Sequence, residues 1–444
     1  MPHRGAVLVL CLAQFVDVLG VTIAVVGLPE IGAGLGGSGA ATQWVVSGYA
    51  LLFGGFLVPA GRIGDRFGHR RVFLGGVLAF TAASLAAGLA TSLLMVIVAR
   101  ASQGLAAAFV VPSAFSLVLK LTAEGGERVK AVGWWTATAA AGGAAGFLFG
   151  GVLVQAFGWR SMFLLNVPIC VLVLVLAPRL PAADPAGGRR REPLDLPGAL
   201  LVTGGLLAGI AGVTGLARPV TLPVAVILLV AFVFVERRAA NPLVPGRLVG
   251  SPQFDSALVV AFALTFATTP ASVVATAFFQ TTNHLPPGLT GVLFAPFSVG
   301  VVLGSAAGVR LLDRLGRRFT AAAGFGGVVL GLVLGTLAVH TGSTALFAVS
   351  LGICGIGLGA ASVAATHAGT AVVEERDHGI ASGLLNTAPQ LGSALGTAVI
   401  GAVALSAVPP DLALGMLVTT AVAVAGTAAT FGLRATPQTS RQAY

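Results

Sequence analysis

Two charged residues stand deep inside apolar stretches of the 444-residue sequence, Asp17 and Arg100. A charge in apolar surroundings is costly, so such residues usually face a cavity or a partner. Burial favours the protonated form of a carboxyl group, whereas a nearby guanidinium favours the ionised form. An acid that can exchange a proton for an arginine partner can carry protons. The pair therefore predicts a site of proton transfer.

A structural role is the alternative for each residue. Arg100 could extend along its aliphatic stem to the outer surface, and Asp17 could be a protonated or arginine-paired structural acid. Gln103 lies three residues after Arg100, on nearly the same helix face, and could extend the polar network. Glu30 follows Pro29 near the end of the first apolar stretch. We consider Glu30 an outer gate or proton entry point, with a solvated helix end as the simpler interpretation.

The composition indicates that these residues belong to a membrane protein. Hydrophobic residues make up 56% of the chain and charged residues 9%, and the mean hydropathy is +0.96. Soluble proteins carry roughly a quarter charged residues, which argues against a large soluble enzyme, a nucleic-acid binder or a disordered protein. No catalytic group or phosphate-binding Gly-x-x-x-x-Gly-Lys-Ser/Thr loop has the spacing of an enzyme or an ATP-driven pump. We therefore expect no enzyme activity, and no metal or cofactor.

The chain contains fourteen apolar segments, and Asp17 and Arg100 lie in the first and the fourth of them. In lipid each has to be a helix, because only hydrogen bonds within the segment satisfy its backbone. We assign them to residues 6–31, 43–61, 72–90, 93–119, 131–157, 161–178, 196–216, 220–235, 254–279, 289–309, 319–339, 344–368, 379–405 and 411–433. On this division 22 of the 25 Lys and Arg residues lie on one side, two lie on the other, and Arg100 remains within a span. The positive-inside rule then predicts fourteen spans across the cell (inner or plasma) membrane, with both termini cytoplasmic.

Two loops on the basic side repeat one another, which predicts the division of the chain. Asp65-Arg66-Phe67-Gly68-His69-Arg70 aligns with Asp313-Arg314-Leu315-Gly316-Arg317-Arg318, eight segments later. Internal repeats are common in transporters. We predict an all-α protein with six-helix bundles at residues 1–178 and 254–444. A cytoplasmic linker and two inserted helices occupy residues 179–253, and the arginines at 189–191 could touch anionic lipid or serve only as a topological signal.

The motifs resemble the major facilitator superfamily, and within it the fourteen-span drug:proton antiporters, over nearly the whole chain. Residues 61–71 are similar to the loop 2–3 signature of the superfamily, residues 100–104 to its span 4 signature, and residues 142–151 to its span 5 antiporter signature. Two further features fit the fourteen-span branch: Leu28-Pro29, and Glu236-Arg237-Arg238 followed by Asn241-Pro242-Leu243. The resemblance implies the major facilitator fold, a proton pathway that involves Arg100, and export.

The resemblance also implies that the loop 2–3 motif is a cytoplasmic latch between the bundles. Glycines let two helix ends turn tightly. Exposed ion pairs are each worth about 1 kcal/mol or less, so such a latch would bias a conformational equilibrium without locking it. An ordinary charged loop is the alternative. The latch residues are Gly61, Arg62, Gly64, Asp65, Arg66, Gly68, Arg70 and Arg71, with Asp313 and Arg314 in the repeat.

The span 5 motif is rich in small residues. Gly142, Gly146 and Gly150 recur every four residues and form one stripe, next to Gly151, as in small-xxx-small helix packing. The resemblance implies that this helix packs against the other bundle and seals one side of the transporter. The family pattern often has proline after the central glycine, where this chain has Phe147.

The first span departs from the family pattern. Fourteen-span exporters usually carry an acid at the position that is Gly20 in this chain. Asp17 lies three residues earlier, which is about 60° round the helix and about 4.5 Å lower. We expect Asp17 to substitute for the family acid, with an altered geometry toward Arg100.

Polar residues elsewhere in the spans could line a substrate cavity. Gln14, Asn386 and Gln390 are the candidates, and ordinary helix packing is an equal alternative for the last two. The late spans contain no additional acid, which favours a neutral, monocationic or amphipathic substrate.

We predict a proton-coupled exporter of small apolar or amphipathic compounds, with a proton symporter or facilitator that imports a nutrient as the alternative. Its expected partners are the substrate, protons and the lipid bilayer, and we expect a monomer.

Overall fold

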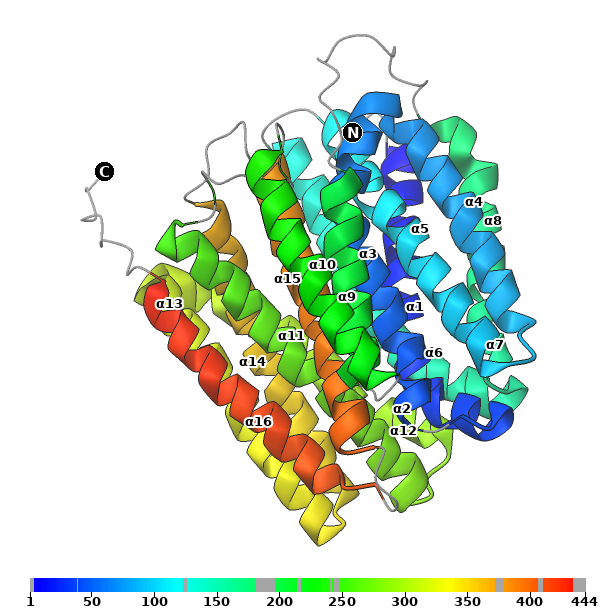
Figure 1. The fold of residues 1–444 in the computed structure, drawn as a ribbon, viewed down its shortest axis with the longest axis vertical. Helices are drawn as coiled ribbons and strands as arrows, with labels where there is room; N and C mark the ends of the chain where they lie inside the picture. The colour runs from blue at the N-terminus through cyan, green and yellow to red at the C-terminus, as the bar shows by residue number, and fades with distance from the viewer. Residues whose placement is uncertain are drawn as a thin grey trace.

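The computed structural model describes residues 4–37, 39–122, 126–180, 196–213, 217–239, 242, 248, 250–371, 378–405 and 410–433. Within these residues every regular element is a helix. The first turn of the first helix and the last turn of the last helix lie at the same end of the bundle (Figure 1). We call the opposite end, which holds α2 and α12, the distal end (Figure 1).

The first half of the chain forms eight helices. They are α1 (Arg4–Leu35), α2 (Gly39–Thr42), α3 (Trp44–Phe67), α4 (His69–Gly88), α5 (Leu93–Lys120), α6 (Gly126–Phe157), α7 (Arg160–Leu164) and α8 (Asn166–Leu176). The rest of the described chain forms α9 (Leu196–Val213), α10 (Arg218–Arg238), α11 (Pro252–Ala277), α12 (Pro287–Leu293), α13 (Ala295–Thr341), α14 (Thr344–Thr370), α15 (His378–Val403) and α16 (Leu412–Ala429).

The expected apolar segments coincide with helical stretches. The sixth corresponds to α7 and α8, which are separated at Leu165. The tenth and eleventh share α12 and α13, because α13 joins two helices across the non-helical Gly316. By length and hydropathy, nine helices in the described part of the chain could cross a membrane, with Pro287–Thr341 counted as one.

The two repeated loops have the same backbone geometry. Gly68 has a φ of 91° between α3 and α4, and Gly316 has a φ of 79° at the junction inside α13. This left-handed region favours glycine, which has no Cβ. Each glycine follows its aspartate by three residues. The repeat seen in the sequence is therefore also a repeat of a helix–helix junction.

Helices of each half pack mainly with one another. In the first half α1 packs on α6, and α5 packs on both α3 and α4. In the second half α13 packs on α14, and α11 packs on α15 and α16. The halves meet along two seams, α3 with α15 and α6 with α12. The elements that carry Asp17 and Arg100 thus belong to the same half.

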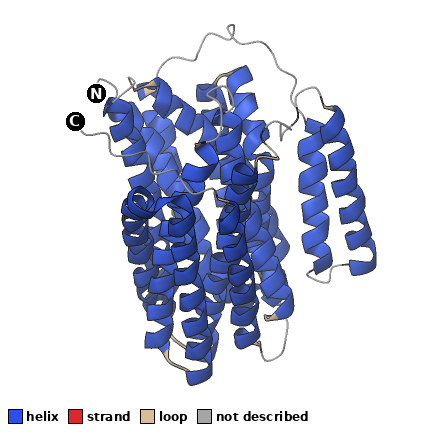
Figure 2. Cartoon of the chain, turned by 90° about the vertical axis from the view of Figure 1, so that its left-hand side faces the viewer, coloured by secondary structure: helices blue, strands red, loops and turns tan. Residues whose placement is uncertain are grey.

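The hairpin of α9 and α10 covers one of these seams. It stands at the edge of the bundle, with α9 in front of α3 and α15 (Figures 1 and 2). Leu51 of α3, Ile210 of α9 and Ala394 of α15 share one buried apolar cluster. A Cβ added to Gly55 would overlap with Thr203, so this glycine lets α9 approach α3 closely. The second hairpin helix, α10, packs on α9.

The glycine stripe of α6 faces α1, a helix of the same half. A Cβ on Gly142 would lie 2.7 Å from the carbonyl oxygen of Phe15, and one on Gly150 would lie 2.8 Å from Cγ1 of Ile23. Gly146 is equally close to α1. Gly151, on the adjacent face, contacts the backbone of α12 in the other half. The close packing expected from the motif is present, but its main partner is α1.

We expect Gly142→Ala to destabilise the protein, because the new methyl group would meet the backbone of α1, which cannot move aside alone. Overpacking of this kind costs about 1–3 kcal/mol. Gly133→Ala on the same helix is the matched control, since a Cβ there meets nothing within 4 Å. Thermal unfolding in detergent should show a lower midpoint for Gly142→Ala alone. Equal midpoints for the two variants would contradict the close contact of α1 with α6.

Candidate functional site

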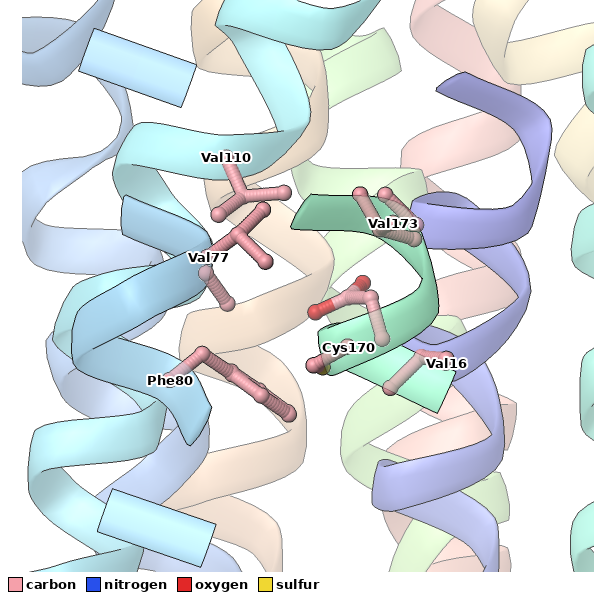
Figure 3. Close-up of a pocket in the computed structure, with 9 residues that line it drawn as sticks. Val16, Val77, Phe80, Val110, Cys170 and Val173 are labelled. Atoms are coloured by element: carbon pink, nitrogen blue, oxygen red, sulfur yellow. The ribbon is translucent and has the colours of Figure 1, made fainter. Parts of the chain in front are cut away.

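Asp17 lies on α1 and is 5% exposed. It lines a small pocket inside the first half, whose other walls come from α4, α5 and α8. Figure 3 shows Val77, Phe80 and Val110 on one side of this pocket and Val16, Cys170 and Val173 on the other. The remaining lining residues are Ala13 and Ala107. Asp17 is thus the one ionisable carboxyl group in otherwise apolar walls.

Tyr49 of α3 is the hydrogen-bond partner of this carboxyl group. Its hydroxyl donates to Oδ1 of Asp17 at 2.5 Å, and the tyrosine is 1% exposed. A donor aimed at a carboxylate stabilises the charged form, which otherwise lacks solvation in an apolar pocket. The contact therefore connects the protonation state of Asp17 to the position of α3.

Arg100 of α5 also contacts Tyr49, at the face of its ring. Its Cζ is 4.3 Å from the centre of the Tyr49 ring, and the side chain is 1% exposed. Such a cation–π contact is worth more when it is desolvated, about 2 kcal/mol. Among the described residues no ion pair joins Arg100 directly to Asp17, and both residues contact Tyr49, Asp17 at its hydroxyl and Arg100 at its ring face.

Arg100 is held by two further groups. Its Nε donates to the carbonyl oxygen of Val45 at 3.0 Å, and its Nη1 donates to Oε1 of Gln103 at 3.0 Å. Nε2 of Gln103 in turn donates to Oγ of Ser84 on α4 at 2.6 Å. Gln103 thus joins Arg100 to Ser84. The network crosses four helices, α1, α3, α5 and α4.

Gly104 explains how α3 and α5 come close enough for this arrangement. A Cβ on Gly104 would lie 2.8 Å from the carbonyl carbon and 2.9 Å from Cα of Tyr49. Real Cβ atoms do not approach a backbone so closely, so any larger residue would push α3 away. The glycine next to Gln103 thus fixes the position of the tyrosine.

The other candidate residues lie apart from this network. Glu30 is half-buried near the distal end of α1, about 20 Å along the helix from Asp17. Gln14 is buried one turn before Asp17, and its Oε1 has no hydrogen-bond partner among the described residues. On α15, Asn386 is exposed, whereas Gln390 lies at the seam, where a Cβ on Gly54 would be 2.8 Å from its Cβ.

The latch residues cluster at the junction of α3 and α4, at the end opposite the distal end. Nη2 of Arg62 donates to the carbonyl oxygen of Pro242 at 2.7 Å, a residue that follows α10. Arg66 lies over the ring of Phe67 at 5.5 Å. Asp313 and Arg314 are exposed before the equivalent junction in α13. The side chain of Asp65 lies outside the described residues. Gly61, Gly64, Gly68, Arg70 and Arg71 complete the junction.

Sequence reasoning missed Tyr49 and Ser84. A signal for the tyrosine was available, because the chain has only two tyrosines against 25 phenylalanines, and this one stands in the middle of the second apolar segment. A hydroxyl retained among so many phenylalanines indicates a hydrogen-bond role. Ser84 gave no comparable signal, since serine is common in packed membrane helices.

The sequence matches known transporters over most of its length. A family model described as Major Facilitator Superfamily matches residues 10–397 and, in a second match, 256–443. The puromycin resistance protein of Streptomyces alboniger is 36% identical, over 93% of this chain and 84% of that protein. The cephamycin export protein of Amycolatopsis lactamdurans is 38% identical, over 89% of this chain and 84% of that protein. The lincomycin resistance protein of Streptomyces lincolnensis is 36% identical, over 88% of this chain and 82% of that protein.

A solved structure has the same fold. The bacterial homolog to the human lysosomal transporter Spinster, in an inward-facing and unoccupied conformation, superposes with a TM-score of 0.69. The match covers 98% of this chain and 99% of that chain at 18% sequence identity. The apolar helices and this fold are those of a multi-pass membrane protein. Family model, relatives and fold agree, and the chain belongs to the major facilitator superfamily.

Proposed function

We propose that this protein is a drug-efflux transporter that exports small apolar or amphipathic compounds by alternating access. The observation that carries the proposal is the set of relatives: three proteins named for resistance to an antibiotic or for its export are 36–38% identical to most of the chain. The glycine-rich α6, which resembles the antiporter signature, supports the same direction of transport.

Proton coupling is the finer part of the proposal, and the buried network of α1, α3 and α5 supports it. Asp17 is accessible to a pocket and held by a single tyrosine hydroxyl. The Nε and Nη1 atoms of Arg100 are bonded to Val45 and Gln103, so protonation of Asp17 breaks neither of these hydrogen bonds. In the proposed cycle Asp17 binds a proton from outside and releases it inside, while substrate leaves in exchange. Glu30, near the distal end of α1, is proposed as a proton entry point.

The proposed topology has fourteen spans across the cell (inner or plasma) membrane, with both termini on the cytoplasmic side. Reading α7 with α8 as one span and dividing α13 at Gly316 gives one helical stretch for every expected segment. The basic residues of the α3–α4 and α13 junctions lie at the end that holds the first turn of α1 and the last turn of α16, which supports this topology under the positive-inside rule. The packing of helices supports a division into bundles at residues 1–178 and 254–444, with 179–253 inserted.

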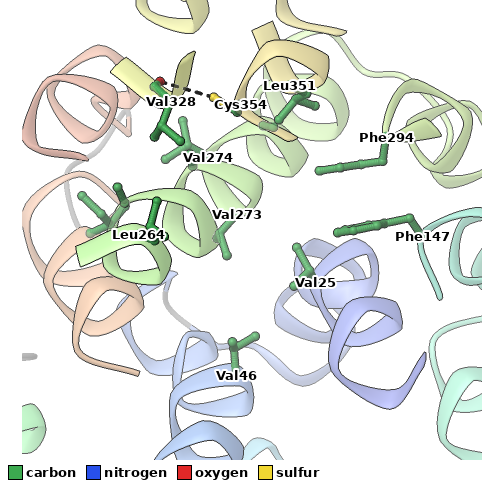
Figure 4. Close-up of a cluster of buried hydrophobic side chains, with 14 of the residues drawn as sticks. Val25, Val46, Phe147, Leu264, Val273, Val274, Phe294, Val328, Leu351 and Cys354 are labelled. Carbon is green, nitrogen blue, oxygen red and sulfur yellow. Dashed lines mark hydrogen bonds between the residues drawn. The ribbon is translucent and has the colours of Figure 1, made fainter. Parts of the chain in front are cut away.

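The contacts between the halves suggest how the bundles rock. Gln280 lies in the π-helical turn Phe278–Thr282, which follows α11. Toward the distal end, its Nε2 donates to the carbonyl oxygen of Val26 on α1 at 3.0 Å. Phe147 and Phe294 stack across the α6 seam with ring centres 4.4 Å apart (Figure 4). Phe147 stands at the position where the family often has proline. In the proposal its ring helps to hold the two halves together toward the distal end. These contacts would have to break for substrate to leave on that side.

Lipid and substrate are the remaining proposed partners. The apolar side chains of α10, among them Val226, Ile227 and Phe234, are exposed and suit contact with the bilayer. Gln14, Asn386 and Gln390 are proposed contributors to substrate contacts. Neutral, monocationic or amphipathic compounds are the proposed cargo, carried by a monomer.

We expect Asp17→Asn to abolish uphill export and to spare exchange of substrate across the membrane. The amide keeps the shape of the acid but cannot carry a proton. The measurement is transport of labelled puromycin into everted membrane vesicles on an imposed pH gradient, together with gradient-free counterflow. Asp411→Asn is the matched control, because asparagine preserves the N-cap that Asp411 provides to Leu414. Uphill transport by Asp17→Asn would refute the proton role, and higher cellular accumulation on expression would favour import.

We expect Tyr49→Phe to slow proton-driven export by about tenfold or more. It removes the hydroxyl that donates to Asp17 and keeps the ring against Arg100. A hydrogen bond to a charged group is worth about 1.5–3 kcal/mol. Tyr49→Leu, which also removes the ring, should reduce export further and lower thermal stability. If Tyr49→Phe transports at the wild-type rate in the vesicle assay, the hydroxyl has no part in coupling.

A further inference from the structure

Asn166, the first residue of α8, is an unusual side chain for the interior of an apolar bundle. It is 1% exposed, and neither its Nδ2 nor its Oδ1 has a hydrogen-bond partner among the described residues. Asparagine at a helix start commonly caps a backbone N–H, but this amide makes no such bond. A buried polar group without a partner destabilises a protein, because it loses its hydrogen bonds to water and gains none in return. Both its donor and its acceptor are therefore available to a small ligand.

The amide faces Gly20 of α1. A Cβ placed on Gly20 would lie 3.7 Å from Nδ2 of Asn166 and 3.7 Å from Cζ of Phe80. These are ordinary van der Waals distances, so the space beside Gly20 accepts a group of about the size of a methyl. A water molecule has a similar size and needs at least two polar partners. The donor and the acceptor of one amide supply them.

This space adjoins the pocket of Asp17. Phe80 forms a wall of both, and Cys170, which lines the pocket, lies one turn after Asn166 on α8. Gly20 follows Asp17 by three residues, about 4.5 Å along α1. Because α1 runs toward the distal end, Asn166 lies between Asp17 and that end of the protein.

We propose that Asn166 and Gly20 form a binding site for one water molecule, which passes protons between the distal end and Asp17. Asn166 holds the water by donating from Nδ2 and accepting at Oδ1, and Gly20 leaves room for it. The water receives a proton as it gives one on toward Asp17, so no charge accumulates at the site. Asn166 is thus a positioning residue for proton transfer. This inference rests on the proposed proton-coupled function.

The test uses the purified full chain in vesicles of phosphatidylethanolamine and phosphatidylglycerol that contain a pH-sensitive dye. Proton-driven puromycin transport and gradient-free puromycin counterflow are measured for each variant. Asn166→Leu, which removes both polar atoms, should slow proton-driven transport by about tenfold or more and leave counterflow unchanged. Asn166→Ser, which keeps a donor and an acceptor, should recover most of the rate.

Gly20→Ala tests the space without touching the amide. Its methyl group fits at 3.7 Å from its neighbours and occupies the proposed water position, so it should slow proton-driven transport as Asn166→Leu does. Gly209→Ala is the matched control, because its Cβ meets Ala225 at the same 3.7 Å distance within the α9–α10 hairpin. This variant should transport like the wild type.

The outcomes separate this inference from the proposed function. Wild-type vesicles without any substrate-coupled proton signal would overturn proton coupling itself. A normal wild-type signal, with Asn166→Leu and Gly20→Ala equally fast, would overturn only the water site. Equal loss of proton-driven transport and counterflow in both variants would also overturn it, since a packing defect affects both. A selective loss in both variants, with recovery in Asn166→Ser, would support the site.

Discussion

A carboxyl group inside an apolar bundle must be neutral or hydrogen-bonded, and much of the first half of this protein is arranged around that constraint. Asp17 has apolar walls on every side of its pocket, and the hydroxyl of Tyr49 is its partner. The tyrosine can reach it only because Gly104 lets the backbones of α3 and α5 approach. The acid on α1 thus depends on a glycine two helices away.

The arrangement separates the two charges that the membrane interior would otherwise pair. The guanidinium of Arg100 contacts a ring face, a carbonyl oxygen and an amide oxygen, while its Nη2 has no hydrogen-bond partner among the described residues. Breaking one partner of a direct buried ion pair leaves the other charge uncompensated, which costs several kcal/mol. Because Asp17 and Arg100 both contact Tyr49 and not one another, a change of charge on Asp17 breaks neither hydrogen bond that Arg100 makes to Val45 and Gln103.

The sequence predicted what depends on composition and local pattern. Apolar segments, the repeated junction and the buried pair Asp17 and Arg100 could be recognised because charge is costly in lipid and glycine is favoured at positive φ. Tyr49 could not be assigned as the intermediary, because which faces of α1, α3 and α5 meet is decided by helix rotation. The same reason applies to the stripe of Gly142, whose partner is α1, and to the amide of Asn166. Periodicity gives the face of a helix, but not the neighbour.

The hairpin of α9 and α10 makes the two seams between the halves of the protein different from one another. Along the α3–α15 seam, lipid meets an added pair of helices that rest on both halves. Along the α6–α12 seam, the two halves contact one another directly. If α3 and α15 move relative to one another, α9 can follow only one of them, and the close approach of Thr203 to Gly55 ties it to α3. The α3–α15 seam therefore lies under an added layer of helices, so the two seams between the halves differ in what separates them from the surroundings.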